Sequence, residues 1–162
     1  SAADPERMRA HVGRVLELAA ALAQERDRTA ARTTAAEALH ALADAIQVAP
    51  APFGRARVAA LAWDVRSDAE RLERADDLSL QRSDLARGGL LAATRALEPL
   101  ATARPCSFQA RLLVNARRAA RAIDVHSPFV FERARIQDAL RATADAYLVF
   151  AERTRPATVG RR

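Results

Sequence analysis

The chain has 162 residues, which is enough for one domain that buries its own core without disulfides or bound metals. About a quarter of the residues are Ala, whereas β-branched residues are sparse and there are only five Gly, so the composition predicts helices and excludes an extensive sheet. The 26 basic residues are all Arg and outnumber the 20 acidic ones, and the net charge of +6 permits contact with polyanions. A GC-rich coding sequence would produce the same number of Arg residues.

No apolar run in the sequence approaches the roughly 20 residues that a membrane-spanning helix needs. Cys106 is the only cysteine, so no disulfide can form within the chain. The sequence begins Ser1-Ala2-Ala3 without an initiator Met. We therefore expect it to be part of a longer protein, and the sequence does not indicate a cellular compartment.

The first predicted helix starts at Asp4-Pro5-Glu6, where Asp4 can accept a hydrogen bond from the first turn and Pro5 suits the first helical position. Apolar residues then recur in one heptad register: Met8, Val15, Leu18, Leu22, Ala36, Leu39, Ala43 and Ile46. The centre of this register is polar: Glu25, Thr29 and Arg32. We predict one supercoiled helix from Pro5 to about Val48, roughly 65 Å long. The alternative is a break near Thr33, because Thr34 and Glu37 have capping-box spacing.

The segment from Ala49 to Gly54 contains two prolines and a glycine and is predicted to be a linker. A second helix follows from about Arg55, with an apolar stripe of Val58, Leu61, Val65, Leu72 and Ala75. A third can start at Ser83-Asp84, where Gly88-Gly89 weakens it and Pro99 is expected to kink or end it.

Ser107 can cap the next helix, which we expect from Phe108 to about Ile123. Its predicted apolar face consists of Phe108, Leu112, Ala116, Ala119, Ala120 and Ile123. Ser127-Pro128 starts the last helix, which ends near Arg153. The fold prediction is an all-α, up-and-down bundle of four to five helices with a long first helix. Residues 1–154 form a single domain in this prediction, and residues 155–162 form a frayed basic tail.

One stretch of the sequence is basic without any acidic residue, from Pro99 to Ile123. On a helical wheel, four of its arginines lie opposite the apolar face: Arg111, Arg117, Arg118 and Arg121. A one-sided Arg face can bind phosphates or an acidic partner, so these residues are the candidate anion-binding site. The alternative is that they complement the helix dipole or pair with acidic residues of the second helix.

Glu37 and His40 have the Glu-x-x-His spacing of carboxylate-bridged di-iron bundles, and Asp44 follows one turn later. Such a centre requires a second copy of the motif, which the sequence lacks. We therefore predict no metal ligands, no cofactor and no catalytic residues. Nothing around Cys106 indicates an activated nucleophile.

Four of the seven aromatic residues (one Trp, one Tyr and five Phe) fall in the last helix. We expect all five of the following to pack in the core or at helix junctions: Trp63, Phe129, Phe131, Tyr147 and Phe150. A small apolar pocket near the last helix is the alternative.

These patterns are typical of a non-enzymatic helical module within a larger protein, one that binds a protein partner or a second copy of itself. A second hypothesis is the binding of nucleic acid or an anionic membrane surface through the Arg face. A third is the binding of a small molecule in an apolar pocket between helices.

Overall fold

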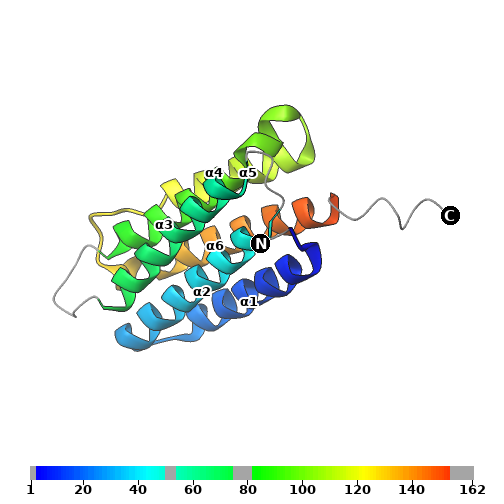
Figure 1. Cartoon of the computed structure of the whole chain (residues 1–162). Helices are drawn as coiled ribbons and strands as arrows, with labels where there is room; N and C mark the ends of the chain where they lie inside the picture. The colour runs from blue at the N-terminus through cyan, green and yellow to red at the C-terminus, as the bar shows by residue number, and fades with distance from the viewer. Residues whose placement is uncertain (1–2, 50–53, 75–81, 154–162) are drawn as a thin grey trace.

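The computed structural model describes residues 3–49, 54–74 and 82–153, and the secondary structure of these ranges is helical, with no strand (Figure 1). The helices are α1 (Pro5–Gln24), α2 (Arg28–Val48), α3 (Arg55–Glu73), α4 (Ser83–Ala103), α5 (Phe108–Arg121) and α6 (Phe129–Arg153). The predicted all-α bundle is confirmed. The described residues form six helices rather than four or five because the first predicted helix is two.

The six helices form a closed ring in which each packs against its neighbours in the chain, and α6 returns to pack on α1. Helices α2, α4 and α6 also contact one another across the ring, so they form the inner part of the bundle. Helix α1 covers the groove between α6 and α2, α3 covers the groove between α2 and α4, and α5 covers the groove between α4 and α6. The outer helices therefore each bury one side and leave the other to solvent.

The prediction of one long first helix is wrong, because the chain turns back at residues 25–27 (Figure 1). The amide of Glu25 donates to Leu22 at the end of α1, and the Asp27 carboxylate accepts from the Ala30 amide at 3.0 Å to cap α2. The alternative break near Thr33 is also wrong, since that residue lies within α2.

Polar residues at the centre of the heptad register explain why the chain turns back. A continuous helix would carry Glu25, Thr29 and Arg32 on its core face, whereas the turn leaves Thr29 exposed at the start of α2. Arg32 remains buried within α2, so the turn relieves only part of this polar burial. The reversal also lays the two apolar stripes against each other in one core. At the other end of this helix pair, the Asp4 amide before α1 donates to the carbonyl of Val48, the last residue of α2, at 2.8 Å.

The connection from α2 to α3 uses a glycine and an arginine. Gly54 precedes α3 with a φ of 97°, a left-handed conformation that residues with a Cβ rarely adopt. The Arg55 guanidinium donates to the carbonyl of Ala49 at 2.8 Å and also to that of Gln47. It thereby satisfies carbonyls at the end of α2 that have no partner within the helix.

Helix α4 continues through the residues that were expected to weaken or end it. Gly88 and Gly89 lie where α4 meets its neighbours: a Cβ on Gly88 would be 3.1 Å from Asp68 Oδ2, and one on Gly89 would be 3.3 Å from Leu39 Cδ2. The two glycines therefore allow α4 to approach α3 and α2 closely. Pro99 does not end the helix, which continues for another turn to Ala103.

Tyr147 joins α6 to α4 in the core. Its side chain is fully buried, and its hydroxyl donates to the Ala93 carbonyl at 2.6 Å. Burial raises the pKa of Tyr147 far above its ordinary value, so the hydroxyl keeps the proton that it donates. In the described ranges no helix is both long and apolar enough to cross a membrane. The predicted basic tail, residues 155–162, lies outside the described residues.

The cap at the start of α2 leads to a prediction about stability. Asp27→Ala should lower the free energy of unfolding by about 1 kcal/mol, because the Ala30 amide loses its acceptor. Asp27→Asn should have little effect, since asparagine caps helices about as well as aspartate. Urea unfolding followed by circular dichroism measures both, and an equal loss in the two variants would contradict a role for the cap.

Candidate functional site

The structure brings together two of the four arginines predicted as an anion site. Arg117 faces α4, where its Nη2 lies 2.9 Å from Glu98 Oε2, and its side chain is only 26% exposed. Arg121, one turn later, lines the same gap between α4 and α5. Arg111 and Arg118 are exposed and are not among the residues that line this gap. The predicted set therefore divides into a pair in a cleft and a pair on the open surface.

The cleft between α4 and α5 has a volume of about 300 Å³. We call it the arginine cleft, and it is lined by Leu91, Thr94, Arg95, Glu98, Arg117 and Arg121. Its third guanidinium, that of Arg95, was not predicted because it comes from α4 and lies outside the acid-free stretch. No pattern within the sequence of α5 could have revealed it.

The arginine cleft carries more positive than negative charge. Its lining has three guanidinium groups and one carboxylate, and that carboxylate, Glu98, is paired with Arg117. Within residues 3–49, 54–74 and 82–153, the side chains of Arg95 and Arg121 make no ion pair or hydrogen bond. Two guanidinium groups in the cleft thus keep their donors available for a ligand.

The face of α5 that packs on the bundle overlaps the predicted face at Ala116, Ala120 and Ile123, and is extended by other residues. Its buried residues are Gln109, Ala110, Leu113, Ala116 and Ala120. Phe108, which was expected on the apolar face, is half exposed. Arg117 lies beside the packed face and contacts Glu98 of α4, whereas Arg111 and Arg118 are exposed, so the arginines do not act as one face.

A second cleft, of about 330 Å³, lies between α3 and α4. We call it the tryptophan cleft, and its lining is Trp63, Asp64, Ser67, Asp68, Arg71, Gly88, Ala92 and Arg95. Trp63 is 68% exposed, so its expected place in the core is wrong. Phe131 is also exposed, at 76%, whereas Phe129, Tyr147 and Phe150 are buried as predicted. Arg95 lines both clefts.

Asp68 is the titratable group that the tryptophan cleft perturbs. Burial against α4 raises the pKa of Asp68, and the carboxylates of Asp64 and Asp84 raise it further. The guanidinium groups of Arg71 and Arg95 act in the opposite direction but do not cancel the effect of burial. The ionised form of Asp68 therefore costs free energy in the folded protein.

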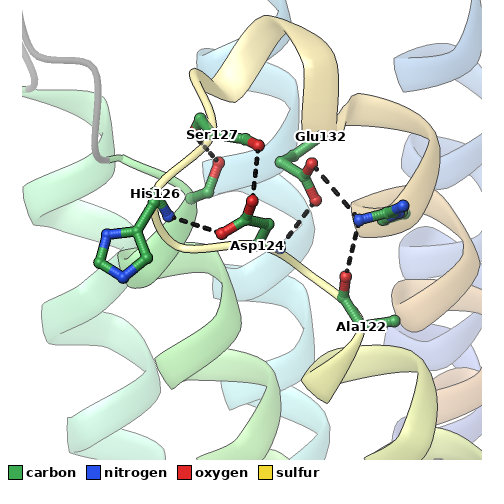
Figure 2. Close-up of polar contacts among 7 residues, drawn as sticks. Ala122, Asp124, His126, Ser127 and Glu132 are labelled. Carbon is green, nitrogen blue, oxygen red and sulfur yellow. Dashed lines mark hydrogen bonds and ion pairs between the residues drawn. The ribbon is translucent and has the colours of Figure 1, made fainter.

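The turn between α5 and α6 holds the end of α5, where Arg121 lies (Figure 2). Asp124 accepts hydrogen bonds of 2.9 Å from the His126 amide and the Ser127 hydroxyl, which lower the pKa of Asp124. The buried carboxylate of Glu132, on α6, accepts from the Asp124 amide at 2.9 Å. This turn fixes the last turn of α5 against the rest of the bundle.

The Glu-x-x-His motif forms no metal centre with its neighbours. Glu37 lies 3.4 Å from Arg14 of α1, whereas His40 Nε2 lies 3.2 Å from Glu73 of α3. The two side chains thus contact different helices. In the part of the chain that the structure describes, no group of three or more His, Cys, Asp and Glu side chains could hold a metal ion. Cys106 is exposed in the turn before α5.

Comparison of the chain with models of protein families, with curated proteins and with solved structures found no match.

The raised pKa of Asp68 predicts a pH-dependent stability difference. Asp68→Asn keeps the shape of the side chain against Gly88 and removes the cost of burying a charge, so it should stabilise the protein at pH 7. The difference should vanish below the unfolded pKa of about 3.9, where the carboxyl is protonated in both states. Thermal unfolding at a series of pH values measures it, and a destabilised variant at neutral pH would contradict the prediction.

Asp124 should show the opposite behaviour, because its pKa is lowered by hydrogen bonds. Asp124→Asn should be destabilising at neutral pH, since an amide nitrogen cannot accept the Ser127 hydroxyl proton. The contribution of Asp124 to the free energy of unfolding is complete above the pKa of Asp124 in the unfolded chain. It is lost as the pH falls through the lower pKa of the folded protein. As the pH rises from acid to neutral, the stability of Asp68→Asn should therefore rise relative to wild type, whereas that of Asp124→Asn should fall.

Proposed function

We propose that this protein is a non-enzymatic helical interaction module that binds a helix of a protein partner along the outer side of α3. The observation that supports this proposal is an exposed apolar stripe on that helix. Its members are Ala56, Ala59, Ala60 and Trp63, at a spacing of three, four and seven residues from the first. Residues at this spacing share one face of a helix.

The first half of α3 is apolar on two sides. Val58, Leu61, Ala62 and Val65 are buried against the bundle. The exposed stripe lies on another side of the same helix, which contacts only α2 and α4 within the described residues (Figure 1). A surface helix that packs on one side is ordinarily polar on the other, so a second apolar side favours a second packing partner.

The chemistry of the stripe suits a partner helix. Its three alanines have short side chains, so another helix can approach them at the close axial distances of packed helices. Trp63 supplies a large apolar anchor at one end, and Arg71 and Arg95 flank it in the tryptophan cleft. Trp and Arg are the residues most enriched among those that dominate interface energies. The partner should therefore place an apolar side chain against Trp63 and acidic groups near the two arginines.

A photo-crosslinking amino acid at position 63 tests this proposal in cells that make the protein. We expect a discrete cross-linked product from position 63 and a different or weaker pattern from position 131, an equally exposed aromatic on α6. Mass spectrometry then identifies the partner. A cross-link to the same sequence would identify the partner as a second copy of this chain.

Two substitutions serve as a matched pair in that experiment. Ala60→Arg places a long cation in the stripe and should abolish the cross-link from position 63. Ala20→Arg makes the same chemical change at an exposed position of α1 and should leave it intact. Equal effects of the two variants, or identical products from positions 63 and 131, would contradict the proposal.

A further inference from the structure

We infer that the arginine cleft between α4 and α5 binds a phosphate monoester dianion. The proposal does not depend on the α3 stripe, although Arg95 lines both the arginine cleft and the tryptophan cleft. Three guanidinium groups from two helices line a cleft of about 300 Å³, and two of them make no hydrogen bond or ion pair within the described residues.

The charge of the cleft matches that of a dianion. Arg95, Arg117 and Arg121 contribute three positive charges and Glu98 contributes one negative charge, which leaves a surplus of two. A phosphate monoester carries a charge of about −1.5 to −2 at pH 7. Asp68 lies beyond Arg95, in the tryptophan cleft, where it is near enough to interact with that guanidinium electrostatically. It is not among the residues that line the arginine cleft.

The geometry of the donors also favours phosphate. A guanidinium presents planar pairs of N–H groups that match phosphate oxygens, and such bonds are the strong class of protein hydrogen bonds. The Glu98 carboxylate lies 2.9 Å from Nη2 of Arg117, and the guanidinium has five N–H donors, so Arg117 can keep this partner and still donate to an anion. Arg95 and Arg121 can donate to the same anion from the two helices.

The cleft is held in place by one contact within its lining and one beyond it. Thr94 of α4 is buried, and its hydroxyl donates to the Leu91 carbonyl of the same helix at 2.8 Å. This bond holds the Thr94 side chain against α4. The turn after Arg121 is fixed to α6 through the Asp124 amide and Glu132. The fold therefore holds the two helix segments that carry the guanidinium groups beside each other before a ligand arrives, which lowers part of the entropic cost of binding.

The size of the cleft argues for a small ligand group. A volume of about 300 Å³ is at the lower end of ligand sites, which suits a phosphate group and the atoms next to it. The same chemistry could come from a free small phosphate ester or from a phosphorylated side chain of a peptide. The experiment therefore includes both.

The test is a nuclear magnetic resonance titration that follows the Arg Nε–H signals of the whole chain at constant ionic strength. The probes are phenyl phosphate, a phosphoserine peptide and, as a carboxylate control, acetate. We expect saturable shifts of the Arg95 and Arg121 signals with phenyl phosphate and much weaker ones with acetate. Tighter binding of the phosphoserine peptide than of phenyl phosphate would identify a phosphorylated protein segment as the source, and the reverse order would identify a small ester.

Two double variants remove the same charge from different places. Arg95→Gln with Arg121→Gln should weaken phenyl phosphate binding by about tenfold or more, since each lost charge-assisted bond is large enough for such a factor. Arg111→Gln with Arg118→Gln removes two exposed arginines outside the cleft and should change the affinity by less than about twofold. Equal losses in both variants would show a general attraction to a basic surface and would overturn the proposal.

A third variant should bind phosphate more tightly than the wild-type protein. Glu98→Gln removes the negative charge in the cleft while keeping the size of the side chain, so it should tighten phosphate binding several-fold. If the cleft double variant does not fold, this variant and the wild-type shifts still decide the question. Weaker binding by Glu98→Gln, or no saturable shift in the wild-type protein at millimolar phenyl phosphate, would overturn the proposal. Substitution of Trp63 should leave these results unchanged, so a failure here is separable from a failure of the α3 interaction.

Discussion

The close approach of the three inner helices is the constraint on which the rest of this structure depends. In α2, α4 and α6, many of the fully buried residues are alanines, including Ala36, Ala43, Ala93, Ala139 and Ala144. Gly89 leaves room for Leu39, and Tyr147 donates to a carbonyl of α4. Because each alanine buries little apolar area, the inner helices need α1, α3 and α5 in their grooves to complete the core. The outer helices therefore bury narrow faces, and their remaining sides are available for charges and exposed apolar residues.

The sequence predicted the helical elements well where a capping residue defined their ends. Asp4 and Ser107 accept hydrogen bonds from the first turns of α1 and α5, as their positions indicated. The reversal between α1 and α2 was missed because a heptad register happens to continue across it. Glu25 and Thr29 at core positions, with a capping aspartate at position 27 between them, were the local evidence against a continuous helix.

The candidate site could be predicted only in part, because it joins residues from helices whose packing no local pattern specifies. A helical wheel groups the arginines of α5, but it cannot show that Arg95 of α4 lies opposite them or that Glu98 pairs with Arg117. Trp63 is a different case. The stripe of Val58, Leu61 and Val65 leaves position 63 on another side of α3, so the sequence itself indicated exposure. The general tendency of large aromatics to be buried was given too much weight.

The abundance of arginine is weak evidence for function, but the distribution of acidic partners among the arginines is more informative. Coding composition can explain why all 26 basic residues are Arg, yet it does not determine which of them the fold places beside carboxylates. Arg14, Arg66, Arg74 and Arg117 each lie within ion-pair distance of an acidic side chain. Arg95 and Arg121 have no such partner within the described residues, although they share a cleft. Both side chains are exposed, so solvent screens much of their mutual repulsion. They nevertheless line one cleft without an ion-pair partner of their own, and a bound anion would supply the negative charge that the fold does not place beside them.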